Sequence, residues 1–271
     1  MNTENIAIFE DTKRQYTTNT DLVRSINSSI AGQVFIPALA TIRHNEYRKN
    51  GQVIVSSKRT FEAAEPYAKQ GKKVAILNFA SATTPGGGVT KGSPAQEECL
   101  CRASTLYPCL CDKDASIKFY APHRMAMNAL NNDDIIYTPN VTVFKTDDGK
   151  YTMMDRKDWY NVNVITCAAP NLRDNPSNPY NVMNGVAVEI SENDLFQLHL
   201  KRISKIMESG IGNDVLILGA FGCGAFLNPP TLVMKAFAAA LQKYRYYYNI
   251  IEFAVYCGKD TYNYNIFKQL K

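Results

Sequence analysis

Residues 72–102 read KKVAILNFASATTPGGGVTKGSPAQEECLCR and join three local patterns in one short stretch. The apolar run at residues 72–80 is typical of a buried strand. The glycine-rich segment after it predicts a loop. Ser93-Pro94-Ala95-Gln96 then predicts the start of a helix, with Ser93 as its cap and Gln96 completing a capping box. We therefore expect a strand, a glycine loop and a helix in this order, which is the building unit of an α/β fold.

The same order recurs nearer the C-terminus. DVLILGA at residues 214–220 predicts a short strand, and FGCGAFLN at residues 221–228 predicts a second glycine loop. Asn228 is expected to cap a helix that begins at the two following prolines and runs to about Tyr244. Two strand–loop–helix units in one chain predict an α/β sandwich with a mostly parallel or mixed sheet.

Further elements lie between and beyond these two units. Residues 162–170 and 250–257 predict strands, and residues 140–154 predict a hairpin with Asp148-Gly149 in its turn. Ser191 is expected to cap a helix that ends at Glu208. Residues 171–187, rich in Asn and Pro, predict a long loop, which could be a lid but is by default a surface loop.

The first seventy residues are polar and carry loose helical patterning. Residues 4–17 and 21–30 predict helices, residues 53–57 a short strand and residues 60–69 a third helix. We expect residues 1–71 to form an N-terminal helical extension packed on a core of residues 72–271.

Composition and charge exclude several classes of protein. Hydrophobic residues make up 45% and charged residues 20% of the 271, as in ordinary globular chains. The net charge of +5 comes from dispersed basic residues, so no direct nucleic-acid binding is expected. No apolar run approaches the roughly 18 residues of a membrane span, and the first residues lack an apolar signal-peptide core. We expect a cytoplasmic protein with no membrane partner.

The seven cysteines do not predict a disulfide framework, because their number is odd and no export signal is evident. Cys99, Cys101, Cys109 and Cys111 form two C-x-C pairs. Structural zinc sites usually use C-x2-4-C spacing, and helix positions two apart point about 200° from each other. No metal site is therefore expected.

The two glycine loops point to a diphosphate ligand. Gly86, Gly87 and Gly88 allow a phosphate to approach bare backbone N–H groups, and residues 222–225 can do the same from the opposite side. Neither loop has the Walker A pattern or the G-x-G-x-x-G pattern of dinucleotide-binding folds. ATP hydrolysis and Rossmann dinucleotide binding are therefore disfavoured.

Glu97 and Glu98 follow the first loop at the start of the predicted helix. Acidic residues there suit the helix dipole without any catalytic role. Adjacent helix residues point about 100° apart, so one carboxyl can face a ligand pocket while the other is held elsewhere. A carboxyl beside a bound diphosphate has a raised pKa and is suited to act as the general acid of glycoside cleavage.

These motifs together resemble the sequence signature of the poly(ADP-ribose) glycohydrolases, and most closely that of the bacterial type. The signature is a triple glycine followed six to eight residues later by Gln-Glu-Glu, and here residues 78–88 and 96–102 carry it. Residues 219–229 are similar to the second diphosphate loop of that family, and residues 164–171 to the strand between the two loops. The resemblance covers residues 72–271, together with the helical N-terminal extension.

The resemblance implies a fold, a reaction and a set of site residues. The fold is a macrodomain-like three-layer α/β/α sandwich with a mixed sheet. The reaction is hydrolysis of the ribose–ribose O-glycosidic bond at the polymer terminus to release ADP-ribose, without a cofactor. Glu98 would be the catalytic acid that later activates the water, and Glu97 would anchor the ribose. The residues implied to bind substrate are Asn78, Ser81, Gly86, Gly87, Gly88, Val89, Gln96, Gly222, Cys223, Gly224, Ala225 and Phe226. Ser81 departs from the asparagine that is common in other macrodomains.

Two alternative functions use the same pocket. The chain could remove single ADP-ribose groups from proteins, or it could be a macrodomain that binds ADP-ribose without turnover. The intact Glu97-Glu98 pair argues against a pure binding module, because binding alone does not require a general acid. The expected partner is poly(ADP-ribose) or an ADP-ribosylated protein, with ADP-ribose as the product. The sequence leaves open which residues bind adenine and whether internal polymer bonds are reached.

Overall fold

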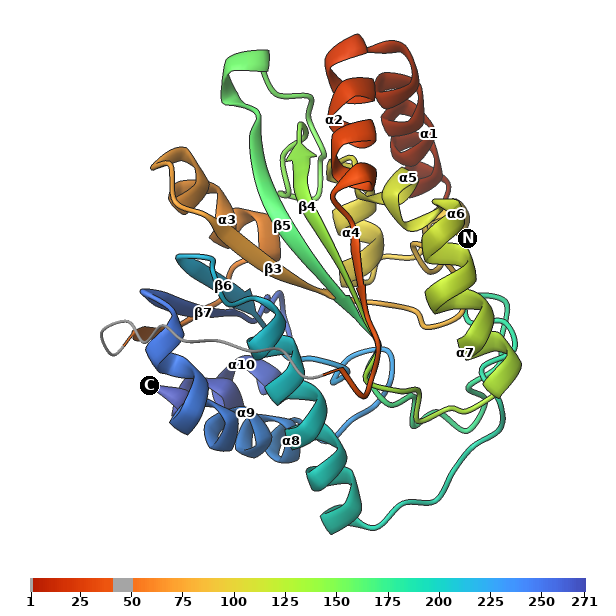
Figure 1. The fold of residues 1–271 in the computed structure, drawn as a ribbon, viewed down its shortest axis with the longest axis vertical. Helices are drawn as coiled ribbons and strands as arrows, with labels where there is room; N and C mark the ends of the chain where they lie inside the picture. Colours follow the sequence, from red (N-terminus) through yellow and green to blue (C-terminus); the bar gives the residue numbers. More distant parts are fainter. Residues whose placement is uncertain (1, 41–50) are drawn as a thin grey trace.

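A seven-stranded mixed sheet forms the centre of the computed structural model, which describes residues 2–40 and 51–271 (Figure 1). The strand order is β1-β4-β5-β3-β6-β7-β2. β4 pairs antiparallel with both β1 and β5, and all other neighbours are parallel. The strands are β1 (Val34–Ile36), β2 (Gln52–Ser56), β3 (Val74–Phe79), β4 (Ile135–Val143), β5 (Tyr160–Cys167), β6 (Val215–Leu218) and β7 (Ile250–Ala254).

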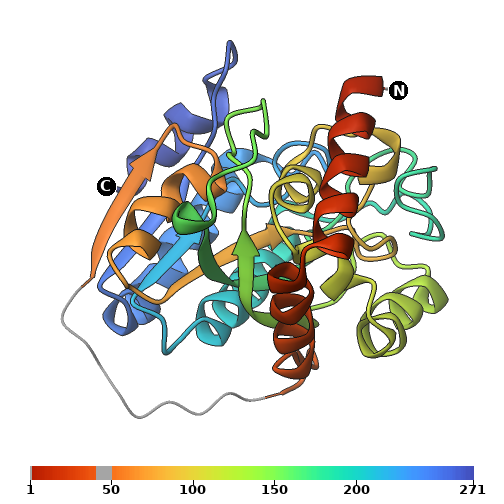
Figure 2. The ribbon, with the colours of Figure 1, turned by 90° about the horizontal axis from the view of Figure 1, so that it is seen from above.

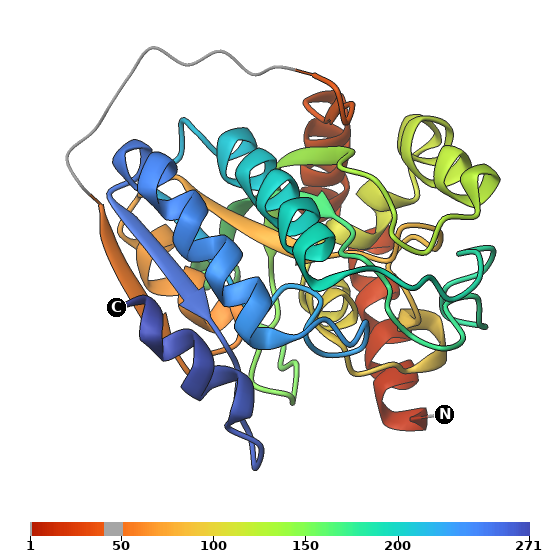
Figure 3. The ribbon, with the colours of Figure 1, turned by 90° about the horizontal axis from the view of Figure 1, so that it is seen from below.

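Helices cover both faces of this sheet. Consecutive strand residues point to opposite faces, so Ile76 joins the core under α1, α3 and α4, whereas Leu77 joins the core under α8 and α9. Figure 3 shows α8 and α9 side by side over the second face. The expected α/β/α sandwich with a mixed sheet is thus confirmed. The helices are α1 (Thr3–Thr18), α2 (Thr20–Ala31), α3 (Thr60–Lys69), α4 (Gln96–Ala103), α5 (Leu106–Leu110), α6 (Lys113–Ala115), α7 (Ala121–Ala126), α8 (Glu192–Ser209), α9 (Pro230–Tyr244) and α10 (Tyr262–Phe267).

The N-terminal helices pack on the core through buried contacts. The Thr12 hydroxyl of α1 donates a hydrogen bond to the Arg102 carbonyl at the end of α4 (2.6 Å), and Phe9 is fully buried. Figure 2 shows α1 and α2 along the side of the molecule away from the C-terminus. The segment before residue 71 is not only helical, because β1 and β2 form the two edges of the sheet. The division into an extension and a core stays a prediction.

Two of the three predicted helix caps, Ser93 and Asn228, are wrong, because the side chains of Gln96 and Asn228 make tertiary contacts instead. α4 begins at Gln96 and not at Pro94, and the Gln96 amide bonds the Phe79 N–H (2.9 Å) and the Leu77 carbonyl (2.8 Å) of β3. α9 begins at Pro230, while the Asn228 amide donates to the Pro170 carbonyl (2.7 Å). Ser191 does cap α8, as predicted.

The predicted hairpin is smaller than expected. Residues 140–143 belong to β4, which pairs with β5, and the two arms around Asp148-Gly149 are joined by a single bridge residue pair, Lys145 and Met153, in place of a ladder. Residues 103–130, where no element was predicted, contain α5, α6 and α7.

A buried ion pair ties α8 to the end of the sheet. Arg202 is 1% exposed and donates to the Asp133 carboxylate (2.8 Å) and to the Leu130 and Ala168 carbonyls (3.0 and 2.9 Å). Lys201 contacts the same carboxylate (2.9 Å) from the solvent side, with its side chain 66% exposed. The two cations therefore offer a matched comparison of a buried and an exposed partner.

We expect Arg202→Met to lower the free energy of unfolding by about 3–5 kcal/mol, because it leaves Asp133 Oδ1 and two buried carbonyls without their donor. Lys201→Ala should cost less than about 1 kcal/mol, since an exposed ion pair contributes little. Urea unfolding followed by circular dichroism measures both. Equal losses in the two variants would contradict this assignment of the buried contact.

Candidate active site

A cavity of about 750 Å³ lies at the carboxyl edge of the sheet. β3 and β6 are parallel neighbours, so the glycine loops that follow them leave the sheet at the same edge. Both loops line this cavity, together with the first turn of α4 and residues 180–181 and 254–256. The structure thus brings together the two loops that the sequence predicted to act on one ligand.

The first glycine loop lies directly against the carboxyl pair. Gly87 has φ +55°, and a Cβ atom there would lie 2.6 Å from Glu98 Oε1, so both backbone conformation and space require glycine. The Gly88 N–H donates to Glu98 Oε1 (2.8 Å). Val89 is fully buried in the core under α4 and anchors the end of the loop. The loop therefore shapes the cavity and also holds one of its carboxyl groups.

Glu97 and Glu98 are 2% and 5% exposed, and their hydrogen-bond partners differ. Glu97 Oε2 accepts from the Ser81 N–H (2.8 Å), and Glu97 Oε1 accepts from the Asn78 amide (3.2 Å). Burial and the neighbouring Glu98 carboxyl raise the pKa of Glu97 well above its ordinary value. Both carboxyl groups line the cavity, although their hydrogen-bond partners differ.

Three polar residues implied to bind substrate have different positions. Asn78 is fully buried and supports Glu97 while also donating to Thr166 Oγ1 (3.3 Å). Ser81 lines the cavity, and its hydroxyl accepts from the Thr84 N–H (3.1 Å). Gln96 lines the cavity too, with its amide bound to the β3 backbone. Their substrate contacts stay predictions.

The second glycine loop contributes Gly222, Gly224, Ala225 and Phe226 to the cavity wall. Gly222 has φ +75°, and a Cβ atom there would lie 2.6 Å from Ala169 Cβ. Cys223 instead packs on the core under α9, and burial raises the pKa of its thiol to about 12. Of the residues in this loop that are implied to bind substrate, Cys223 is the one that does not line the cavity.

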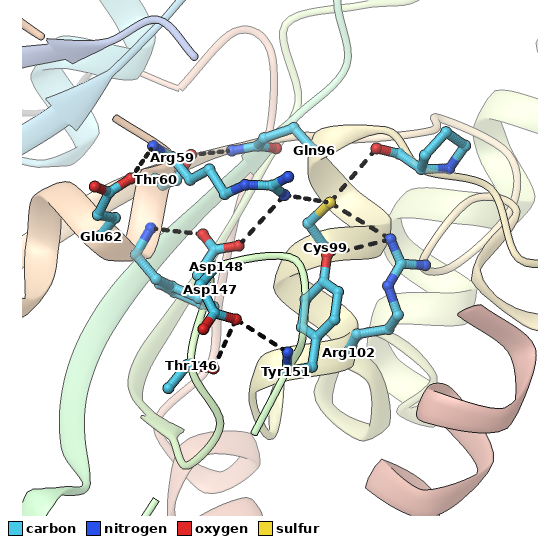
Figure 4. Close-up of polar contacts among 12 residues, drawn as sticks. Arg59, Thr60, Glu62, Gln96, Cys99, Arg102, Thr146, Asp147, Asp148 and Tyr151 are labelled. Atoms are coloured by element: carbon cyan, nitrogen blue, oxygen red, sulfur yellow. Dashed lines mark hydrogen bonds and ion pairs between the residues drawn. The ribbon is translucent and has the colours of Figure 1, made fainter. Parts of the chain in front are cut away.

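Several residues of the cavity wall were not found from the sequence. Arg59 lies with its guanidinium between Asp147 and Cys99 (Figure 4), and it stacks on the Tyr256 ring with 4.4 Å to the centroid. Tyr180, from the long loop at residues 171–187, lies against Gly88. These side chains come from distant segments of the chain that share no motif, so no local sequence pattern predicted them.

Residues 2–40 and 51–271 contain no group of three or more His, Cys, Asp or Glu side chains arranged to hold a metal ion. Nor does any helix in these ranges have the length and apolar character needed to cross a membrane.

The sheet, the glycine loops and the carboxyl pair define an α/β/α protein with a cavity at the carboxyl edge of a mixed sheet. Within this class the chain belongs to the family described as microbial-type PARG, catalytic domain, whose model matches residues 3–146. PARG denotes poly(ADP-ribose) glycohydrolase. A comparison with curated protein sequences found no match.

Solved bacterial PARG structures are similar to the whole chain. The enzyme from Thermomonospora curvata has 26% identity and a TM-score of 0.82, covering 98% of this chain and 99% of its own. The same enzyme bound to the inhibitor ADP-HPD has 27% identity and a TM-score of 0.79, covering 98% of each chain. The enzyme from Deinococcus radiodurans in complex with ADP-ribose has 28% identity and a TM-score of 0.73, covering 90% of this chain and 96% of its own.

We expect Gly87→Ala to lower the free energy of unfolding by about 1–3 kcal/mol, because alanine is strained at positive φ and its Cβ would collide with Glu98. Gly224→Ala should change it by no more than about 0.5 kcal/mol, since a Cβ there meets nothing within 4 Å. Chemical denaturation of both variants makes the comparison. A Gly87→Ala protein as stable as the wild type would show that the loop does not hold this conformation.

Glu97→Gln should gain stability relative to the wild type as pH rises. The pKa of Glu97 is higher in the folded than in the unfolded protein, so the wild type loses stability as pH rises above the ordinary value of 4.5. Glutamine has no such penalty, and its single side-chain oxygen can still accept from the Ser81 N–H. Urea unfolding at pH 4.5 and pH 7.5 tests this. A stability difference independent of pH would contradict the raised pKa.

Proposed function

We propose that this protein hydrolyses poly(ADP-ribose) at the chain terminus and releases ADP-ribose, with Glu98 as the general acid. The observation that carries this proposal is the Glu98 carboxyl, buried at the wall of the cavity and held by the N–H of the first glycine loop. The PARG structures bound to ADP-ribose and ADP-HPD, with TM-scores of 0.73 and 0.79, support the choice of ligand.

The diphosphate of the substrate would lie between the two glycine loops. Gly87, Gly222 and Gly224 line the cavity without side chains of their own, which lets phosphate oxygens approach the backbone of both loops. Lys91 and Arg173 also line the cavity, one beside each loop, and they contribute positive charge near the bound anion. This arrangement would fix the terminal ribose beside the carboxyl pair.

Glu98 fits the role of acid better than Glu97 does. Both Glu97 oxygens hold partners of the first strand and its loop, which suits a group that positions the ribose. Glu98 uses Oε1 for Gly88, while its Oε2 has no hydrogen-bond partner in the described part of the chain and can serve the substrate. The protonated carboxyl would donate to the leaving ribose oxygen as positive charge develops on the sugar. The resulting carboxylate would then take a proton from the attacking water and regain its starting state.

The N-terminal helix supports attack at the chain end. Asn2, which precedes α1, lines the cavity, and the Asn5 amide donates to the Gly92 carbonyl (3.0 Å). α1 therefore closes the cavity beside the first glycine loop. A cavity closed on one side admits a polymer terminus more readily than a continuous strand. The cytoplasmic location inferred from the sequence remains a prediction.

Glu98→Gln should lower the turnover of poly(ADP-ribose) about 10²–10⁴-fold, the usual contribution of a general acid. ADP-ribose binding should be retained, because the glutamine oxygen can still accept from the Gly88 N–H. Release of ADP-ribose measures turnover and calorimetry measures binding.

Full activity in Glu98→Gln would overturn the mechanism. Binding of ADP-ribose by a wild type that releases none from polymer would overturn the proposed reaction and favour a binding module. Release from a mono-ADP-ribosylated protein but not from polymer would favour the other hydrolase activity.

A further inference from the structure

Cys99 lies between two guanidinium groups at the wall of the cavity (Figure 4). Arg102 Nη2 donates to its sulfur at 3.4 Å, and Arg59 Nη1 donates to it at 3.7 Å. The thiol itself donates to the Pro94 carbonyl (3.5 Å). The sulfur thus accepts from two cations that come from α4 and from the residue before α3.

The surroundings of this sulfur contain unused hydrogen-bonding capacity. Arg102 is 1% exposed, and its Nε has no hydrogen-bond partner among the described residues. The Asp147 side chain is 2% exposed, and its Oδ1 lacks a hydrogen bond there as well, although Arg59 lies 3.8 Å away. Buried polar groups are normally paired, so Arg102, whose Nη2 already contacts the sulfur, keeps a free donor in Nε for an oxygen added there.

We propose that Cys99 is a modification site, oxidised by hydrogen peroxide to a sulfenic acid that Arg59 and Arg102 stabilise. The sulfur attacks one peroxide oxygen, an S–O bond forms and the O–O bond breaks. Sulfur loses two electrons, and the other oxygen leaves as water with the thiol proton. Thiol and peroxide thus give sulfenic acid and water.

The geometry favours this cysteine over the other six. Guanidinium groups stabilise negative charge on sulfur and on an oxygen bound to it through charge-assisted hydrogen bonds. Among the described cysteines, Cys99 is the one that lines the cavity, which gives a small oxidant a path to the sulfur. Cys101 and Cys109 are fully buried in the core, whereas Cys111 is exposed but has no guanidinium contact in the described structure.

Oxidation at this position would affect the ligand. Cys99 lines the same cavity as Glu98, so an oxygen added to its sulfur enters the space in which the ligand is proposed to bind. Negative charge and volume there would oppose the bound anion and weaken its binding. This consequence rests on the proposed function, whereas the oxidation itself does not.

The first experiment measures labelling and needs no turnover. The whole protein is exposed to hydrogen peroxide in the presence of dimedone, and peptide mass spectrometry follows each cysteine with time. We expect Cys99 to be labelled at least about tenfold faster than Cys111. Arg59→Gln should slow the labelling of Cys99 several-fold, and Arg24→Gln, a change of an exposed arginine on α2, should leave it unchanged. Equal rates at Cys99 and Cys111 would overturn the proposal even if the Arg59 variant were poorly folded.

The second experiment measures activity after peroxide as a fraction of the same protein untreated. The wild type should lose most of its ADP-ribose release and recover it with dithiothreitol, while Cys99→Ser should keep its own untreated level. A wild type labelled at Cys99 with undiminished turnover would overturn the effect on the site. Labelling of Cys99 in a protein without any initial turnover would count against the proposed function while supporting the oxidation.

Discussion

Glu97 and Glu98 are consecutive residues whose carboxyl groups are both buried, and the rest of the site depends on this constraint. Burial of a carboxyl is unfavourable unless hydrogen-bond donors replace water. The donors here are the N–H groups of Ser81 and Gly88 and the amide of Asn78. All of them belong to β3 or to the loop after it, so β3 and α4 must meet in one relative position. The bonds from the Gln96 amide to β3 hold the first turn of α4 in that position.

The parts of the fold and site that local patterns determine could be predicted from the sequence. The apolar runs gave β3, β5, β6 and β7, and Ser191 gave the start of α8, because burial and capping depend on neighbouring residues. The two glycine loops and the carboxyl pair were predicted to share one pocket, and they do. That prediction needed only the rule that parallel strands carry ligand loops at their carboxyl edge.

The remainder depends on contacts between distant residues, which a local pattern does not contain. Ser93 and Asn228 have the residue types of helix caps, yet α4 and α9 start elsewhere. The Asn228 side chain is engaged by Pro170, 58 positions away, and by His199, 29 positions away. Arg59, Asp147 and Tyr256 likewise meet at the cavity only after the sheet has formed. The positions of such side chains depend on the fold and not on the residues next to them in the sequence. Sequence patterns therefore did not predict them.

The first turn of α4 places four consecutive side chains in four different environments. Gln96, Glu97, Glu98 and Cys99 are consecutive, and the 100° turn per residue gives each of them different surroundings. Gln96 contacts the β3 backbone, Glu97 contacts Asn78 and Ser81, and Glu98 contacts the glycine loop. Cys99 is left facing two arginines. A shift of this turn would alter all four environments together. The support of α4 by β3 therefore matters as much to the proposed chemistry as the identity of the acid.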